Sequence, residues 1–363
     1  MNLFDLDTPA LVVDLDRLEA NVESMAARAR AAGVRLRPHT KTHKTPEIAR
    51  LQVAAGASGI TVAKLGEAEV MAAAGFIDIL VAYPLLGAAK LARLARLRET
   101  ARVIVSLDSL EVARGLGALG VASGEPIEFY VEVDTGLHRL GRPSGEATAE
   151  LVERVAEVPG LKVLGLMTHA GHAYGVGPGD LGALVEDEVA GLRATMGLCA
   201  QRGVELTELS VGSTPTARAE LAAAGVTEVR PGTYVFNDTT MIGLGAASEE
   251  TCAAHVLATV VSRPSEDRFV IDAGTKCLTS DGDDRPGWLR VAGRDDLAFE
   301  FLNEEHGVGV IDLERGRPLA VGDKLLVIPA HVCPVVNLFA SMTLVRAERV
   351  EGEWAVAARG RVR

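Results

Sequence analysis

The feature that most constrains the fold is an alternation of short apolar runs with longer helical stretches. Eight runs rich in β-branched residues begin at Val34, Gly59, Asp78, Arg102, Ile127, Leu161, Glu205 and Thr227. The segments between them are rich in Ala, Leu, Glu and Arg, and several end beside a glycine, the usual C-terminal cap of a helix. About eight strand–helix units over roughly 210 residues predict an α/β fold, a (β/α)8 barrel of the TIM type.

A doubly wound open sheet shows the same alternation, but polar residues at the strand ends favour the barrel. Lys41 follows the first predicted strand, Arg139 the fifth and His169 the sixth. The active face of a barrel is formed by the loops at the carboxyl ends of its strands. We therefore expect these residues to share one face and to carry the chemistry.

The chain outside this alternation predicts a second domain. A strand-like run, PALVVDLD, starts at Pro9, and after about residue 250 strand-like segments follow one another without helices between them. That pattern is typical of an antiparallel β-domain, which the early strand would join. We expect an N-terminal strand in residues 1–15, the barrel in 16–248 and the β-domain in 249–363.

The composition argues against several classes of protein. The chain has 363 residues, 48% of them hydrophobic, and a net charge of −12, which disfavours a nucleic-acid partner. It contains no run of eighteen apolar residues, and MNLFDLDTPA does not resemble a signal peptide, so we expect no membrane association and a cytoplasmic location. The four cysteines are far apart in the sequence, which argues against a disulfide framework.

The stretch RPHTKTHK, residues 37–44, concentrates positive and titratable groups in an acidic chain. Lys41 should project into the mouth of the barrel. A lysine forms a Schiff base with a carbonyl when neighbouring cations or burial lower its pKa, and Arg37, His39, His43 and Lys44 would supply that environment. On this stretch alone, a solvated basic turn explains the residues equally well.

Two later loops suggest that phosphate binds at the same face. SVGSTPTA, residues 210–217, opens a predicted helix after the seventh strand, and Gly232 and Thr233 follow the eighth. Barrels commonly bind phosphate with the loops after strands seven and eight, although GSTPT also fits an ordinary helix start. A lysine at strand one and a phosphate cradle at strands seven and eight would hold two ends of pyridoxal phosphate.

Motifs in a fixed order give the chain a family resemblance. RPHTKTHK, DTGLHRLG, MTHAGH, VGSTPT, VRPGTYVFND, DAGTKCLTSD, NEEHG and PAHVCPVVNL follow one another over essentially the whole chain. The sequence thereby resembles the fold-type III, alanine-racemase-like pyridoxal-phosphate enzymes, and more narrowly their D-threonine aldolase and D-serine dehydratase branch. The RPHxKTHK and PxHxCPxxNL motifs are specific to that branch, whereas DTGxxRLG and VRPG are shared with the wider superfamily.

The resemblance implies roles for particular residues. It makes Lys41 the cofactor-bearing lysine, Arg139 the partner of the phenolic oxygen and His169 the side chain packed on the ring. Either Tyr174 or Arg230 would meet the pyridine nitrogen. The expected cofactor site also includes His39, Ser213, Thr214, Gly232, Thr233 and Tyr234. The resemblance further implies a homodimer with active sites at the subunit interface.

A pair of residues in PAHVCPVVN suggests a metal site. His331 and Cys333 are two residues apart, so on a strand both would point to one face. Imidazole with thiolate suits Zn²⁺ and, less comfortably, Mn²⁺. Alone, the pair reads better as a buried cysteine beside a histidine, but the resemblance implies a divalent metal, with Mg²⁺ a further option. Glu304, Glu305 and His306 would lie around it or form a surface turn.

The resemblance implies a reaction on a small D-β-hydroxy-α-amino acid. The metal would bind the β-hydroxyl, His172 or else His43 would take its proton, and the Cα–Cβ bond would break to give glycine and an aldehyde. The alternatives are a D-serine or 3-hydroxy-D-aspartate dehydratase with the same lysine and metal, and a 3-hydroxy-D-aspartate aldolase. A racemase is disfavoured because no tyrosine follows Tyr234. A cofactor-carrier role would not need the β-domain.

Overall fold

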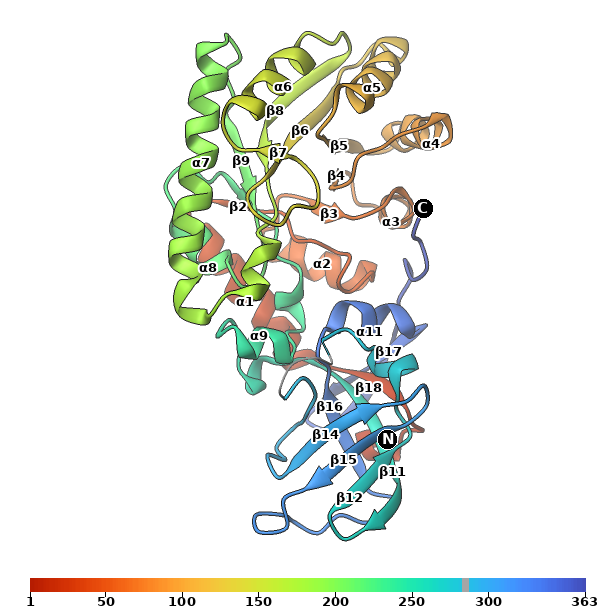
Figure 1. Ribbon diagram of the computed structural model, residues 1–363. Coiled ribbons are helices and arrows are strands. Elements are labelled where there is room, and N and C mark those ends of the chain that lie inside the picture. The colour runs from red at the N-terminus through yellow and green to blue at the C-terminus, as the bar shows by residue number, and fades with distance from the viewer. Residues whose placement is uncertain (283–286) are drawn as a thin grey trace. The chain divides into compact units, whose positions relative to one another are not determined.

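The computed structural model describes residues 1–282 and 287–363 (Figure 1). Contacts divide the chain into two compact units. The β unit comprises Met1–Glu23, Thr42–Glu47 and Thr233–Arg359, and the barrel unit comprises Ser24–Lys41, Ile48–Gly232 and Gly360–Arg363. The domain boundaries expected from the sequence remain predictions.

The eight predicted strands of the barrel unit form one parallel sheet, in the order β2-β10-β9-β8-β6-β5-β4-β3. They are β2 (Arg35–Leu36), β3 (Ile60–Val62), β4 (Asp78–Val81), β5 (Arg102–Leu107), β6 (Ile127–Asp134), β8 (Leu161–Met167), β9 (Glu208–Val211) and β10 (Glu228–Val229). The short strand β7 (Arg142–Pro143) pairs with β6 at the side. The sheet closes through a parallel bridge from His39 to Thr61, so the predicted barrel is confirmed.

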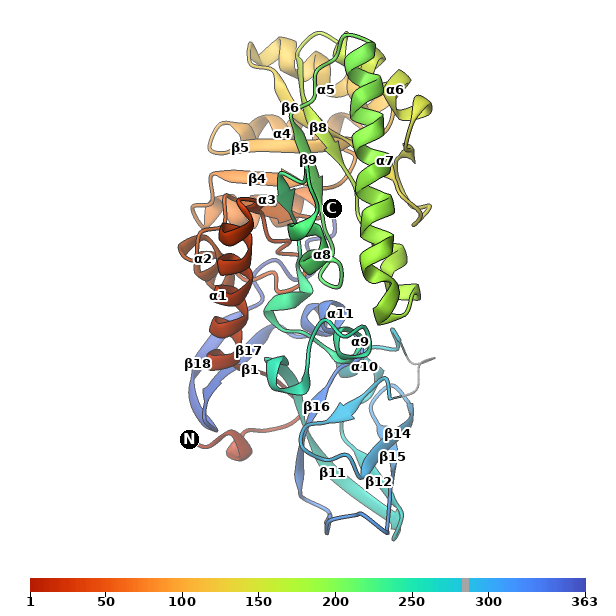
Figure 2. The same ribbon diagram turned by 90° about the vertical axis from the view of Figure 1, so that its left-hand side faces the viewer.

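Helices cover the outside of these strands, as Figures 1 and 2 show for α4 to α7. They are α1 (Leu15–Ala32), α2 (Pro46–Ala54), α3 (Leu65–Ala73), α4 (Ala88–Arg98), α5 (Leu110–Ser123), α6 (Glu146–Ala156), α7 (Leu181–Gln201) and α8 (Ala217–Ala222). Successive strand residues face opposite sides of a sheet. Accordingly, Ile79 and Val81 of β4 belong to the core shared with the helices, while Leu80 belongs to a separate inner cluster.

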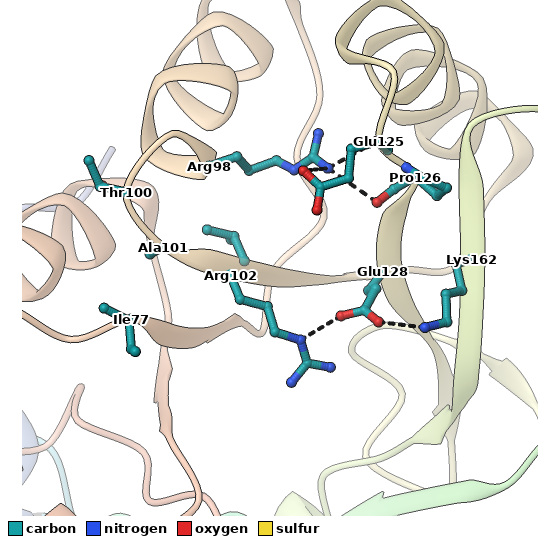
Figure 3. Close-up of a pocket in the computed structure, with 10 residues that line it drawn as sticks. Ile77, Arg98, Thr100, Ala101, Arg102, Glu125, Pro126, Glu128 and Lys162 are labelled. Carbon is teal, nitrogen blue, oxygen red and sulfur yellow. Dashed lines mark hydrogen bonds and ion pairs between the residues drawn. The ribbon is translucent and has the colours of Figure 1, made fainter.

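Paired charges occupy the amino ends of the barrel strands. Each group in this row pairs with the next. The pairs are Lys162–Glu128 (2.9 Å), Glu128–Arg102 (2.6 Å), Arg102–Asp78 (2.9 Å), Asp78–Arg37 (2.5 Å) and Arg37–Glu228 (2.8 Å). Figure 3 shows the depression over part of this row, where Glu128 joins Arg102 and Lys162. These pairs form a charge ladder at the end of the barrel opposite the predicted active face. Because its opposite charges neutralise one another, we interpret the depression as part of the barrel's structure and not as a binding site.

The β unit is a mixed sheet that includes the early strand. Its strands are β1 (Ala10–Asp14), β11 (Ala254–Ser265), β12 (Arg268–Ile271), β13 (Arg290–Val291), β14 (Leu297–Leu302), β15 (Gly307–Ile311), β16 (Lys324–Ile328), β17 (Ser341–Arg346) and β18 (Arg349–Ala355). Strand β1 pairs antiparallel with β11, as predicted, but parallel with β17. Among the described pairs of this sheet, the others are antiparallel.

The expectation of a C-terminal region without helices is wrong. The helices α10 (Thr275–Leu278) and α11 (Val332–Leu338) lie after residue 250, and α9 (Thr239–Gly243), just before it, belongs to the same unit. Segment VCPVVNL is rich in valine and reads as a strand, but Pro334 is in the first turn of α11, where its missing N–H costs no helical hydrogen bond. Across the part of the chain that the structure describes, no helix has the length and apolar character needed to span a membrane.

The charge ladder predicts unequal effects of two arginine substitutions. Arg37 is 4% exposed and bonds the fully buried Glu228, whereas Arg102 is 47% exposed. Arg37→Met removes the nearest positive charge from the buried Glu228 carboxylate and should lower the free energy of unfolding by about 3–5 kcal/mol. Arg102→Met should cost less than about 1 kcal/mol. Chemical denaturation of both variants measures the difference, and equal losses would contradict the structural role given to burial.

Candidate active site

The lysine of the basic stretch emerges where the barrel closes. The segment after β2 is held to β3 by the Thr61 N–H donating to Pro38 (2.8 Å) and the Thr40 N–H donating to Thr61 (2.8 Å). Lys41 follows directly, and its own N–H lies 3.4 Å from Nδ1 of His39. Lys41 therefore leaves the barrel at the carboxyl end of its first strand, as predicted.

Three cations gather around two histidines at this end of the barrel. Burial lowers the pKa of His39 well below its usual range, and the charges of Lys41, Arg230 and Arg139 lower it further. The same three charges and burial lower the pKa of His169 to about 3, although its contact with the Gly212 carbonyl works against them. Both imidazoles are therefore neutral near pH 7, in an electropositive pocket suited to an anionic ligand.

Arg37 does not contribute to this environment as expected. Its guanidinium bonds Glu228 and Asp78 at the other end of the strands, so its charge is neutralised there. His43 and Lys44 fall in the β unit, where the Lys44 ammonium donates to the Asn337 side chain (2.9 Å). The electropositive pocket of the barrel unit is formed by Lys41, Arg139 and Arg230 instead.

Arg139 and His169 line one small cavity, which also includes Glu132 and Leu137. The guanidinium of Arg139 lies 4.0 Å from the Glu132 carboxylate and is about half exposed. His169 donates from Nδ1 to the Gly212 carbonyl (2.9 Å), which leaves Nε2 as its unprotonated nitrogen. The structure thus brings together the two residues that the resemblance assigned to the phenolic oxygen and to the face of the ring.

Arg230 is buried and held by two contacts within the barrel. Its guanidinium donates to the Thr168 carbonyl (2.5 Å) and to the Ser210 hydroxyl (2.5 Å). Tyr174, the other residue considered for the pyridine nitrogen, lies in the short helix η2 (Gly171–Gly175) and is partly buried. These positions do not choose between the two, and both remain predictions.

The loop after β9 approaches the chain after β10 closely. Gly212 has a φ of 146°, and a Cβ there would lie 2.5 Å from the backbone nitrogen of Arg230. Only glycine fits this approach. Ser213 and Thr214 follow it, 3% and 8% exposed. The loop after β10 provides Gly232, which ends its barrel segment, and then the short helix η4 (Thr233–Val235), with Thr233 and Tyr234, in the β unit.

These residues fit pyridoxal phosphate. The cofactor carries an aldehyde that reacts with a lysine, an anionic oxygen and a phosphate group, and the barrel unit offers Lys41, two arginines and a loop with buried hydroxyls. The neutral His39 and His169 add no charge of their own. The fit thus rests on how this unit arranges cations, imidazoles and hydroxyls, in addition to the sequence motifs.

The two histidines considered as proton acceptors differ in their surroundings. His172 lines a depression with Asp134, Asp187 and Glu188. Its Nδ1 is buried and has no hydrogen-bond partner among the described residues, and burial lowers the pKa of this histidine. His43 belongs to the β unit, is fully buried, and accepts from the Thr45 N–H at Nδ1 (3.1 Å). The unused nitrogen favours His172 as the proton acceptor.

The pair His331 and Cys333 lies at the start of α11 and not on a strand. His331 is the N-cap residue, and Cys333 lies in the first turn. The imidazole bonds Asp281 through Nδ1 (2.5 Å) and also contacts the Cys333 sulfur. Burial alone would lower the pKa of His331, but Cys333, Asp238 and Asp281 raise it to about 10.

This donor set fits a divalent metal. A carboxylate on one imidazole nitrogen orients the other nitrogen as a ligand, an arrangement common in metal sites. In residues 1–282 and 287–363, no group of three or more histidine, cysteine or acidic side chains is arranged to hold a metal. Water or substrate would therefore have to complete the coordination. Glu304 and Glu305 pair with Lys276 (3.0 and 2.6 Å) as an exposed turn.

Two acidic residues that support this pair were missed from the sequence. Asp238 is fully buried and accepts from the N–H groups of Met241 (2.9 Å) and Val332 (3.1 Å), so it joins the starts of α9 and α11. An aspartate before TTMIG is a recognisable N-cap signal. Asp281 is fifty residues from His331, and no local pattern connects them.

Comparisons with known proteins place this site in a family. A model of the alanine racemase N-terminal domain matches residues 13–240, and a serine dehydratase domain model matches residues 253–345. The chain belongs to the fold-type III, alanine-racemase-like family of pyridoxal-phosphate enzymes. Its similarity to aldolases and dehydratases of that family supports the lyase class.

Individual relatives are similar over nearly their whole length. D-threo-3-hydroxyaspartate dehydratase of Delftia sp. HT23 is 36% identical, covering 97% of each chain. The crystal structure of D-threonine aldolase from Filomicrobium marinum superposes with a TM-score of 0.92 at 33% identity, covering 100% of this chain and 98% of that one. The metal-free form of a cysteine-to-alanine mutant of D-threo-3-hydroxyaspartate dehydratase superposes with a TM-score of 0.88 at 35% identity, covering 98% of each.

The low pKa of His169 predicts that its imidazole does not take up a proton between pH 8 and 5. An unfolded histidine binds a proton near pH 6.5, whereas folded His169 does so near pH 3. The unfolded state therefore binds more protons in that window, and this histidine makes stability fall as the pH drops from 6.5 towards 3. In the cofactor-free protein, the ¹⁵N signals of His169, assigned with His169→Asn, should stay those of a neutral imidazole from pH 8 to 5. A midpoint near 6.5 would contradict the electropositive pocket.

The carboxylate behind His331 predicts a loss of metal affinity. Asp281→Ala removes the group that orients the imidazole and should weaken Zn²⁺ or Mn²⁺ binding by about 10–100-fold in calorimetric titrations. Asp295→Asn is the matched control, because Asp295 is an exposed carboxylate of the same unit paired with Arg315. Equal metal affinity in the Asp281 variant and the wild type would show that Asp281 does not orient the ligand.

Proposed function

We propose that this protein is a lyase that uses pyridoxal phosphate and a divalent metal to cleave D-β-hydroxy-α-amino acids into glycine and an aldehyde. The D-preference and the retro-aldol direction come from the resemblance to the D-threonine aldolases. The cofactor is proposed on the family membership and on the fit of the barrel pocket. The metal, proposed as Zn²⁺ or Mn²⁺, with Mg²⁺ also considered, rests on the paired histidine and cysteine.

One observation carries this proposal furthest. Within the β unit, the Cys333 sulfur lies 3.2 Å from the hydroxyl of Thr42, the residue that follows Lys41 in the chain. It also lies 3.8 Å from the hydroxyl of Thr233, the residue that follows Gly232. Cys333, one of the two proposed metal ligands, therefore contacts the residues that directly follow the cofactor lysine and the phosphate loop.

Different residues would bind different parts of the cofactor. Lys41 would hold the cofactor covalently, and Arg139 and His169 would position its ring from the cavity that they share. Ser213, Thr214, Gly232 and Thr233 would hold the phosphate, with His39 and Tyr234 beside the site. When bound, the cofactor supplies an electron-withdrawing ring for the electron pair that the Cα–Cβ bond releases.

Proton transfer falls to His172 in this proposal. Retro-aldol cleavage requires removal of the proton from the substrate's β-hydroxyl. His172 keeps a buried nitrogen without a described partner, and its lowered pKa keeps it neutral and able to accept a proton. The metal would act as a Lewis acid that makes this hydroxyl more acidic. His331 and Cys333 would fix the position of the metal.

A dehydratase is the second candidate. The 36% identical Delftia relative is a dehydratase, and it covers 97% of this chain, close to the 100% covered by the aldolase. Both reactions would use the same lysine and the same metal pair. D-serine or 3-hydroxy-D-aspartate would then lose its β-hydroxyl as water, and hydrolysis of the resulting imine would release ammonia and an oxo acid. 3-Hydroxy-D-aspartate is also a candidate aldolase substrate. The homodimer and the cytoplasmic location remain predictions.

Product identification with D-threonine separates these reactions. The cofactor-loaded protein should release glycine and acetaldehyde, lose this activity with a chelator, and regain it with Mn²⁺ or Zn²⁺. Lys41→Ala should abolish both the absorbance of the lysine-bound cofactor and the reaction, whereas Lys90→Ala on α4 should change neither. Ammonia with 2-oxobutanoate would replace the aldolase by the dehydratase. If neither pair of products appears, D-serine and 3-hydroxy-D-aspartate are tested next.

A further inference from the structure

A line of three oxygen atoms leads from the proposed phosphate loop into the protein. The Ser213 hydroxyl lies 2.7 Å from the Thr216 hydroxyl, which lies 2.6 Å from Oε1 of Glu220. Ser213 is 3% exposed, and the other two residues are fully buried. The outer end of this line is thus a proposed phosphate ligand, and its inner end is an ionisable carboxyl group.

The protonation state of Glu220 decides in which direction the Ser213 hydroxyl donates its hydrogen. Each hydroxyl has one hydrogen to donate. If Glu220 is ionised, Thr216 donates inward, and Ser213 can satisfy Thr216 only by donating inward as well. Ser213 then presents lone pairs to the phosphate. If Glu220 is protonated, it donates to Thr216, Thr216 donates to Ser213, and the Ser213 hydrogen is free for the phosphate.

We propose that Glu220 is a positioning residue that must carry a proton for Ser213 to donate to the cofactor phosphate. Cofactor binding is then linked to uptake of a proton by a side chain that the cofactor does not touch. The inference rests on the proposed function, because that proposal assigns Ser213 to the phosphate.

The surroundings of Glu220 favour its neutral form. Its second oxygen, Oε2, is buried without a hydrogen-bond partner among the described residues, which is costly for an ionised carboxylate. Glu188 on α7 faces it and also has one unpartnered oxygen. Burial and then Glu188 raise the pKa of Glu220 to about 8, although the Thr216 hydroxyl, Arg230 and the Ser213 N–H act in the opposite direction.

Cofactor titrations against pH test the proposal. Pyridoxal phosphate is titrated into the cofactor-free wild type and Glu220→Gln between pH 6.5 and 9.5, and binding is followed by absorbance. The glutamine amide donates to Thr216 at every pH, so the ratio of wild-type to variant Kd should rise about tenfold from pH 7 to 9. Effects of Lys41 and of the cofactor's own ionisation are common to both proteins and cancel in the ratio.

Two further variants test the line of hydroxyls and the neighbouring charge. Thr216→Val breaks the line, so cofactor binding should no longer weaken at alkaline pH, whereas Thr216→Ser should keep that loss, with thermal unfolding confirming that both fold. The negative charge of Glu188 raises the pKa of Glu220, so Glu188→Gln should lower that pKa. The loss of cofactor binding at alkaline pH should therefore remain but begin at a lower pH.

The results separate this inference from the proposed function. A wild type that binds the cofactor with a Kd ratio constant across pH would overturn the role of Glu220. An alkaline loss of binding of the same size in Thr216→Val and Thr216→Ser would overturn it as well. If the wild type does not bind pyridoxal phosphate at any pH, the proposed function itself fails.

Discussion

The closure of the barrel is the constraint on which the site depends. Strand β2 contains two residues, and the barrel closes beyond it through two backbone hydrogen bonds, from the Thr61 N–H to the Pro38 carbonyl and from the Thr40 N–H to the Thr61 carbonyl. These bonds fix the direction in which the chain leaves the barrel, and Lys41 is the next residue. A flexible lysine therefore starts from a rigid backbone position, which reduces the entropy lost when its tip is held in one place.

The two ends of the barrel use charge in opposite ways. At the amino ends of the strands, arginine, lysine and carboxylate groups alternate at hydrogen-bonding distance and neutralise one another. At the carboxyl ends, the charges of Lys41, Arg139 and Arg230 are felt by His39 and His169, whose pKa values fall. The first arrangement stabilises the barrel, whereas the second leaves a field that an anionic ligand would balance.

The sequence predicted the barrel because β-branched runs and helical segments alternate regularly, and it placed Lys41, Arg139 and His169 at one face because strand ends converge there. Other features depend on contacts that local patterns do not encode. The valine-rich start of α11 has strand propensity but forms a helix, and Asp281 reaches His331 across fifty residues. Glu220 lies in an ordinary helical segment, and only its burial beside Thr216 reveals its environment.

The hydroxyl of Ser210 connects the two ends of the barrel. It donates to Glu228, which belongs to the charge ladder, and accepts from Arg230 of the electropositive pocket. A side chain at the amino ends of the strands can thus influence the orientation of the Arg230 guanidinium at their carboxyl ends. Directed evolution of such an enzyme would gain from libraries that include residues at the amino ends of the strands, because residues there can alter the reaction without contacting a substrate.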